Sequence, residues 1–146
     1  MTTIVQAKDD ILAAFYDAWT ANPLSSGISV FFDSLDEDAD DKDANKSWAR
    51  ASIKHFDGQF SRQSLASSDG TKNYQRDGNI TVGIFTPIGD GVDLNSGLAS
   101  IVVNSFEGKR TPNGVWFRNI RFHEVGVDGT WFQTNVKADF NYSENK

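Results

Sequence analysis

The strongest constraint on the fold comes from two long segments near the end of the chain, residues 115–125 and 131–142. Both are rich in aromatic and β-branched residues, and an Asp-Gly turn signal lies between them, a pattern that predicts a β-hairpin. The second segment alternates strictly, and successive residues of a strand point to opposite faces of its sheet. We therefore expect its even-numbered positions to face the core: Phe132, Thr134, Val136, Ala138, Phe140 and Tyr142.

The same alternation constrains the turn of this hairpin. Ile120 and Phe122 are the expected buried pair of the first segment, and directly opposed residues share a face. Even positions must then pair with even positions, whereas a two-residue Asp-Gly loop would place Arg121 opposite Val136. We therefore predict a loop of three or five residues, with Gly129 in the left-handed conformation of a bulge-type turn.

The start of the first segment is out of phase with this face. Val115 and Phe117 are odd-numbered, although the expected core positions of the hairpin are even. Two explanations are open: a β-bulge near Arg118-Asn119, or a contact of these two side chains on the other side of the sheet.

Length and composition are typical of a single domain. A chain of 146 residues is long enough to bury about two-thirds of its unfolded surface. It has no cysteine, which excludes disulfides and thiolate chemistry and suits a reducing compartment. No signal peptide is recognisable, and no apolar run approaches the roughly 20 residues of a membrane span. We expect one domain over residues 1–146, without a membrane partner.

The net charge of −6 is concentrated in one short tract. Seven carboxylates stand there against Lys42 and Lys46, so this segment alone contributes −5. A calcium loop would need glycine at its sixth position and glutamate at its twelfth, and the tract has neither in the frames that begin at Asp36 and at Asp41. Because like charges repel, we expect a solvated loop insertion at about residues 33–46. After Asp33, its acidic residues are Asp36, Glu37, Asp38, Asp40, Asp41 and Asp43.

Two amphipathic helices are predicted. The first begins after a Thr2 or Thr3 cap and ends near Ala21, since apolar residues recur at spacings of three and four until an Asn-Pro pair. The second is expected to run from an Asp93 cap to Glu107. Its apolar face is predicted to consist of Val92, Leu94, Leu98, Ile101, Val102 and Phe106.

Strands are expected between these helices. Residues 28–32 form an apolar run, and residues 47–56 alternate and are expected to continue past an Asp-Gly pair to residue 65. Residues 74–86 form a further strand, with an interruption at Asp77-Gly78. Together the elements predict an α+β fold: a single domain with a mostly antiparallel sheet, two helices packed on one face and a C-terminal β-hairpin.

No arrangement of residues points to catalysis, a cofactor or a metal. His55 and His123 lie in predicted strands without a metal-ligand spacing. The glycines of residues 89–91 precede a helix, as in a phosphate loop, but the Gly-Lys-Ser/Thr signature is missing. The basic and aromatic residues around Arg118 fall short of the basic stripe that would bind nucleic acid.

Three segments of the chain resemble a known family: residues 76–91 (RDGNITVGIFTPIGDG), 106–119 (FEGKRTPNGVWFRN) and 124–142 (EVGVDGTWFQTNVKADFNY). They are similar to the tail terminator, or tail completion, proteins of tailed bacteriophages, which are similar in role to the minor tail protein U of phage lambda. The resemblance covers the whole chain, although the N-terminal helix and central strands match in layout rather than in motif. The acidic tract is a departure from the family core.

This resemblance implies a structural assembly protein rather than an enzyme, with no cofactor. Family members are α+β subunits that form a homohexameric ring on the completed tail tube and then present a surface for joining the head. The implied partners are other copies of the chain, the tail tube protein and a head-completion or connector protein. Phage DNA passes through such a ring without sequence-specific binding, and an acidic bore that repels it is a further hypothesis. The implied location is the head-proximal end of the virion tail, after assembly in the host cytoplasm.

The predicted hairpin carries more aromatic residues than one core can take. Two consecutive aromatic pairs each place one ring on each face of the sheet, and we expect both pairs at the outer end of the hairpin. The ring that is left over needs a cover, from a helix or from a neighbouring subunit. We therefore predict a partner interface at Lys109, Arg110, Trp116, Phe117, Arg118, Trp131 and Phe132.

Two other interpretations are open. Another head-tail connector or minor tail protein of the same phage would share these features. A small ligand-binding or enzyme domain would instead hold His55 or His123 in an aromatic-lined pocket under a curved sheet, and it would be a stable monomer.

Overall fold

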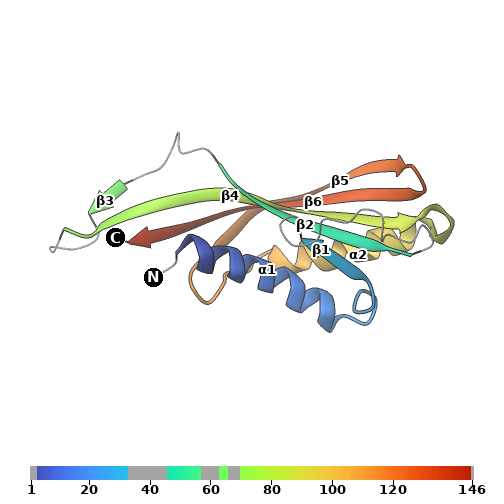
Figure 1. Cartoon of the computed structure of the whole chain (residues 1–146), viewed down its shortest axis with the longest axis horizontal. Coiled ribbons are helices and arrows are strands. Elements are labelled where there is room, and N and C mark those ends of the chain that lie inside the picture. Colours follow the sequence, from blue (N-terminus) through green and yellow to red (C-terminus); the bar gives the residue numbers. More distant parts are fainter. Residues whose placement is uncertain (1–2, 33–45, 57–62, 66–69, 146) are drawn as a thin grey trace.

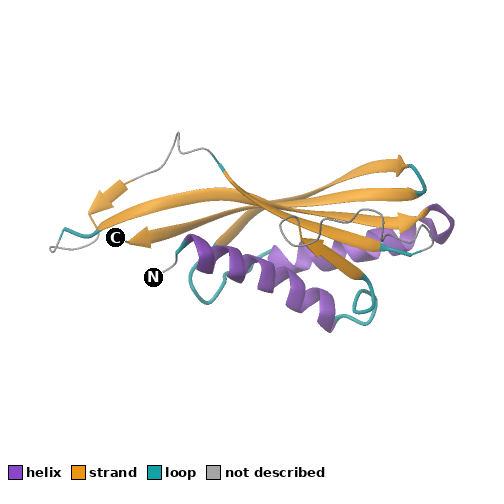
Figure 2. Cartoon of the chain, in the orientation of Figure 1, coloured by secondary structure: helices purple, strands orange, loops and turns teal. Residues whose placement is uncertain are grey.

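The computed structural model describes residues 3–32, 46–56, 63–65 and 70–145, and this part of the chain contains two α-helices and one six-stranded sheet. Both helices lie on the same side of the sheet (Figures 1 and 2). The predicted α+β fold is therefore confirmed. In chain order the elements are α1 (Ile4–Ala21), β1 (Ser29–Phe32), β2 (Trp48–His55), β3 (Gln63–Leu65), β4 (Lys72–Pro87), the short 3-10 helix η3 (Ile88–Asp90), α2 (Gly91–Phe106), β5 (Trp116–Asp128) and β6 (Trp131–Asn145).

The sheet is built around two long central strands. Its order is β1-β2-β4-β6-β5, and β3 pairs with the start of β4. β1 and β2 are parallel, and the other pairs are antiparallel. β4 and β6 pair from Asn73 opposite Asn145 to Pro87 opposite Trp131. One end of this pair extends well beyond the start of α1 (Figure 1).

Gly78 does not interrupt β4, and the prediction of a break there is wrong. The strand is continuous, with Gly78 paired to His55 on one side and to Phe140 on the other. A Cβ at this position would stand 2.5 Å from the carbonyl oxygen of Lys54 and 2.5 Å from the Phe140 ring. The glycine therefore allows a close approach inside the sheet, which is one of the uses of glycine in strands. The predicted link through residues 57–62 lies outside the described residues.

α1 follows the sequence prediction closely. The Thr3 hydroxyl accepts a hydrogen bond from the Gln6 backbone N–H, and the Gln6 side chain accepts one from the Thr3 N–H, both at 3.2 Å. This reciprocal capping box satisfies two donors that the first turn leaves without partners. The buried residues of the helix are Ala7, Ile11, Phe15 and Trp19.

α2 departs from its prediction at the first turn. It begins at Gly91, so Asp93 lies inside the helix rather than capping it. Its carboxylate is still well placed, because negative charge stabilises the first turn of a helix. Val92, a predicted member of the apolar face, is instead exposed. The residues that α2 buries are Asn95, Leu98, Ala99, Val102, Ser105 and Phe106.

The core lies between the two helices and the sheet face beneath them. Even-numbered residues of β6 from Thr134 to Glu144 are buried, which confirms the predicted inner face of this strand from Thr134 to Tyr142, whereas Phe132 is only partly buried. They meet alternate residues of the two neighbouring strands, since side chains of one parity share a face. The strand residues of this core include Ala49, Ala51, Ile80, Val82, Ile84, Val136, Ala138 and Phe140.

Candidate functional site

The β5–β6 hairpin turns through Gly129 and Thr130 alone. The prediction of an odd-numbered loop is therefore wrong, although Gly129 has the predicted left-handed conformation, with φ of 64°. A bulge at Val125 shifts the register by one residue instead. Beyond this bulge Phe122 lies opposite Val136, so the predicted pairing of even with even positions is confirmed. One extra residue in a strand has the same effect on phase as one extra residue in the turn.

A second bulge, at Asn119-Ile120, explains the change of phase at the start of β5. Two residues of β5 face a single residue of β6 there, so the odd-numbered Val115 and Phe117 turn to the core. The ring centroid of Phe117 lies 4.8 Å from that of Phe106 on α2. Of the two explanations that the sequence leaves open, the bulge near Arg118-Asn119 is confirmed.

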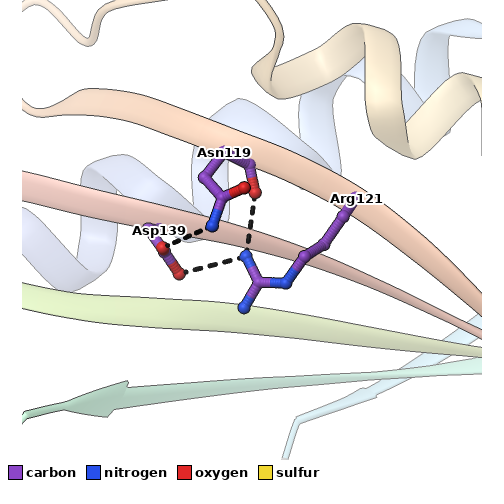
Figure 3. A network of polar contacts seen from close by, with 3 residues as sticks. All are labelled: Asn119, Arg121 and Asp139. Carbon is purple, nitrogen blue, oxygen red and sulfur yellow. Dashed lines mark hydrogen bonds and ion pairs between the residues drawn. The ribbon is translucent and has the colours of Figure 1, made fainter.

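A polar network holds the second bulge (Figure 3). Asn119 has a φ of 53°, a left-handed conformation in which residues other than glycine are uncommon. Its side-chain amide donates to Asp139 Oδ2 at 3.1 Å, while Arg121 Nη1 donates to the Asn119 carbonyl oxygen at 2.8 Å and to Asp139 Oδ1 at 3.3 Å. Charge-assisted hydrogen bonds of this kind offset the cost of the unusual backbone conformation.

The two aromatic pairs of the hairpin lie at its opposite ends. Trp116 pairs with Asn141 near the open end, whereas Trp131 directly follows the turn. Ten residues of β6 separate these positions, which corresponds to about 33 Å along a strand. The prediction of one aromatic outer end is therefore wrong, because neighbouring strands of a hairpin run in opposite directions.

Five of the predicted interface residues gather at the open end of the hairpin: Lys109, Arg110, Trp116, Phe117 and Arg118. Trp116 is half exposed, and the Arg110 guanidinium lies 4.5 Å from its ring centroid in a cation–π contact. Arg118 Nη2 lies 3.9 Å from Asp77 Oδ1 across the sheet. Phe117 is part of the core and is not available to a partner.

The other two predicted residues, Trp131 and Phe132, lie at the turn. Trp131 makes an edge contact with Trp48 at 5.8 Å between centroids, and Trp48 stacks on Phe85 at 3.9 Å. The indole N–H of Trp131 also donates to the Lys46 carbonyl oxygen at 3.4 Å. The cover that this ring was expected to need is thus supplied by β2 of the same chain, and Trp116 is the more exposed of the two tryptophans.

Five exposed apolar side chains, which the sequence does not predict as a group, lie on the segments that meet at this turn. The Ile88 N–H donates to the Thr130 carbonyl oxygen at 3.3 Å, which brings η3 and the start of α2 beside the turn. We name this surface the hairpin-tip cluster; its side chains are between 44% and 69% exposed, and they are Ile88, Val92, Phe122, Val125 and Val127. The alternation of Val125 and Val127 about a glycine is a signal for it, but the periodicity places Phe122 and Val92 in the core.

Phe122 is exposed because α2 offers it no large neighbour. A hollow of about 220 Å³ lies beside its ring, lined on the helix by Ser96, Ala99 and Ser100. β5 is also an edge strand among the described residues. The Phe122 ring is therefore on the core side of the sheet but has only small α2 side chains beside it, and its predicted burial is wrong.

A groove of about 540 Å³ separates α1 from α2. Its lining includes the charged residues Asp10, Asp17, Lys109 and Arg110 and the apolar residues Ile101 and Phe117. Asp10 Oδ1 accepts a hydrogen bond from Asn113 at 3.2 Å, while its buried Oδ2 has no donor in the described part of the chain. Neither histidine lines this groove.

The two histidines have different surroundings. His55 Nε2 and the Tyr142 hydroxyl are hydrogen-bonded at 2.7 Å. Burial, and then the positive charges of Lys8 and Arg76, lower the pKa of His55. Burial, and then Glu144, raise the pKa of Tyr142 to about 12. His123 is exposed on the edge strand, and the described residues contain no group of three or more acidic or histidine side chains able to hold a metal.

The acidic tract lies outside the described residues, so the hypothesis of an acidic bore stays a prediction. Its acids are Asp36, Glu37, Asp38, Asp40, Asp41 and Asp43. No helix in the described part of the chain is long and apolar enough to span a membrane.

Comparisons with known proteins identify the fold and leave the function open. No family model matches the chain, and no curated protein matches it. Among 23 matching chains of solved structures, one aligns with a TM-score of 0.64 at 18% identity, covering 92% of this chain and 94% of that chain. The name of that protein states no function. At this identity the likeness establishes that the two chains share an α+β fold over almost their entire length.

Proposed function

We propose that this chain is a structural assembly protein of tailed phages, which caps the completed tail tube as an oligomeric ring and provides the surface for joining the head. The hairpin-tip cluster is the observation that carries the proposal. It places five exposed apolar side chains on η3, the first turn of α2 and the turn-side half of β5, the segments that meet at the hairpin turn, and exposed apolar surface beyond scattered single residues often marks an interaction site. A second copy of the chain is the partner that we assign to it.

The arrangement of β5 supports self-association. One side of this strand pairs with β6, and its other side has no strand partner among the described residues. Edge strands present free backbone donors and acceptors, and apolar side chains beside them favour pairing with another chain. A contact between the tip of one copy and a different surface of the next is heterologous, and such contacts close into rings when the rotation allows.

The ring would have separate contacts for its other partners. We assign the tail tube protein to one of its faces and a head-completion protein to the other, at the head-proximal end of the tail. The exposed Trp116, with Arg110 stacked on its ring, is the second surface that we assign to a contact, because tryptophan and arginine are enriched at interface hot spots. Assembly would take place in the host cytoplasm, and phage DNA would pass through the ring without sequence-specific binding.

The test compares two aspartate substitutions by light scattering after size exclusion. Val127→Asp places a charge in the hairpin-tip cluster and is expected to convert the ring to monomers, because a carboxylate buried without a partner is strongly unfavourable. Val5→Asp is the matched control: Val5 is exposed to the same degree but lies in the first turn of α1, where a carboxylate is tolerated. Loss of the ring in both variants, or in neither, would contradict the role of the cluster.

Another connector or minor tail protein is the alternative within the same class. Such a protein would also form an oligomer, so its distinguishing property is the binding partner. Co-purification with the isolated tail tube protein supports a terminator. Binding only to a head-completion protein supports a connector.

A ligand-binding domain is the second candidate, favoured by the groove between α1 and α2. Its buried Asp10 Oδ2 has no hydrogen-bond donor among the described residues, and a cationic ligand would supply one. This candidate predicts a monomer whose thermal stability rises with small amines, and Asp10→Asn should abolish that rise. Unchanged melting with such compounds would remove this candidate.

A further inference from the structure

Residues 121–124 form a regular stretch of β5 along the exposed edge of the sheet. The stretch lies between the two bulges, and it pairs one to one with residues 137–134 of β6. On its other side no strand pairs with it in the described part of the chain. In an antiparallel ladder alternate residues direct both backbone groups to the same neighbour, so two of these four residues direct their N–H and C=O groups to the free edge. The stretch is therefore able to accept one more strand.

A hollow adjoins each face of this stretch. The inner hollow, on the face under the helices, has a volume of about 220 Å³ and lies beside Phe122, which is 60% exposed. The rest of its lining consists of Ser96, Ala99, Ser100, Glu124 and Thr134. The outer hollow, of about 350 Å³, adjoins Arg121 and Lys137 on the face away from the helices. A residue added opposite Phe122 would share its face, and the next residue along the added strand would point to the outer hollow.

The outer hollow is positively charged. Arg121 lies directly opposite Lys137, a like-charge pair that is unfavourable unless something compensates it. Arg121 contacts Asp139 at 3.3 Å (Figure 3), whereas Lys137 has no carboxylate within 4.0 Å in the described part of the chain. An acidic side chain in the outer hollow would therefore compensate the charge of Lys137.

The inner hollow suits an apolar side chain instead. The exposed ring of Phe122 and the small side chains of α2 present apolar surface there, and covering such surface removes it from water. The exposed Glu124 also lines this hollow, and it disfavours a second carboxylate because like charges on neighbouring strands repel. The two faces of one short edge thus select side chains of different chemistry.

We propose that the edge of β5 at residues 121–124 binds an extended segment of a partner protein in which acidic and apolar residues alternate. The segment adds a strand to the sheet, and its backbone pairs with the free groups of β5. One apolar side chain enters the inner hollow beside Phe122, and an acidic neighbour faces Lys137 in the outer hollow. In strand addition of this kind the main chain supplies affinity and alternate side chains supply specificity.

The charges of the outer face argue against β5 of a second copy as this segment. Antiparallel pairing of two β5 strands would bring Arg121 and Lys137 of both copies to one face, because opposed residues share a face. Like charges on facing strands are unfavourable, so a segment with acids at these positions is the better partner. Strand addition here rests on the proposed contact of β5 with another chain, but it requires no ring.

Fluorescence anisotropy of labelled peptides tests strand addition on the full-length protein. The probe is the heptapeptide Glu-Val-Glu-Val-Glu-Val-Glu, which is expected to bind. The same peptide with lysine in place of glutamate should bind at least about tenfold more weakly, because its charges meet Arg121 and Lys137. Proline in place of the central valine should abolish binding, since proline lacks the N–H group that a paired strand donates. Absence of binding by the glutamate peptide, or equal binding of all three peptides, would overturn the proposal.

Two pairs of variants locate the binding site. Lys137→Glu is expected to reverse the preference, so that the lysine peptide binds more tightly than the glutamate peptide. Lys54→Glu is its matched control: Lys54 lies on the same face, but in β2, which β4 and β6 separate from β5. Phe122→Ser should weaken binding of the glutamate peptide several-fold, whereas Phe56→Ser removes a ring of similar exposure elsewhere and should leave it unchanged. Equal effects within either pair would contradict the assignment of the site.

Light scattering on the same samples separates strand addition from ring formation. A ring of six chains that binds no glutamate peptide would overturn strand addition but not the ring. A monomer that binds the peptides with the expected preferences would support strand addition and contradict the ring.

Discussion

The replacement of Asn95 by alanine is the sharpest test of how α2 is fixed to the sheet. Asn95 is 1% exposed, and its side-chain amide donates to Thr86 Oγ1 and to the Phe132 carbonyl oxygen, both at 3.1 Å. Its Oδ1 accepts a hydrogen bond from the Thr134 hydroxyl. One side chain thus connects the helix to both central strands, at the point where β6 leaves the turn.

The loss of stability follows from the polar groups that the substitution leaves without a hydrogen-bond partner. Thr86 and Thr134 are both buried, so neither hydroxyl regains a water molecule when the amide is removed. Each hydrogen bond contributes about 1 kcal/mol, and a buried polar group left without a partner costs about 1–3 kcal/mol. Alanine recovers roughly 0.5 kcal/mol through its higher helix propensity. The expected loss in the free energy of unfolding is about 2–4 kcal/mol.

Urea denaturation followed by circular dichroism measures this loss. Asn104→Ala in the same helix is the matched control, because Asn104 is exposed and its replacement has the same effect on helix propensity. We expect the control to lie within about 0.5 kcal/mol of the wild type. If Asn95→Ala is as stable as Asn104→Ala, the bridge between α2 and the sheet does not stabilise the fold and the reasoning is refuted.

Two further predictions concern the sheet. Gly78→Ala is expected to lower the free energy of unfolding by about 1–3 kcal/mol, because the added Cβ would overlap the Lys54 carbonyl oxygen. Gly89→Ala is the control: its added Cβ meets nothing within 4 Å, so the same urea titration should show no change in stability. Burial lowers the pKa of His55 below 6.5, so the unfolded chain binds more protons and stability should fall as the pH decreases below about 6.5. His55→Gln should make the free energy of unfolding less dependent on pH than it is in His123→Gln. An equal pH dependence of the two variants would contradict the role of His55.

Local signals are sufficient to predict much of the fold. α1 is predictable because its cap at Thr3 and its apolar spacing agree with each other. The inner face of β6 follows from strict alternation, and the phase of Phe117 relative to Phe122 reduces the possibilities to two, of which the bulge at Asn119-Ile120 is the one that occurs. In each case the information lies within a few neighbouring residues.

The remaining features depend on contacts between distant segments. An extra residue at Val125 and an extra residue in the turn produce the same pairing, so alternation alone does not distinguish them. The exposure of Phe122 depends on the small side chains that α2 places beside it, which the periodicity of β5 does not contain. The placement of Arg50 and Lys137 on one surface of the sheet requires the strand order, because β4 lies between their strands.

The mass of the wild-type protein in solution tests the proposed function most directly. Six copies of the 16.1 kDa chain give a ring of about 97 kDa, which multi-angle light scattering after size exclusion separates clearly from a monomer. A ring-forming assembly protein predicts this oligomer, and predicts that Val127→Asp removes it. A mass of one chain at every concentration and ionic strength would contradict the account.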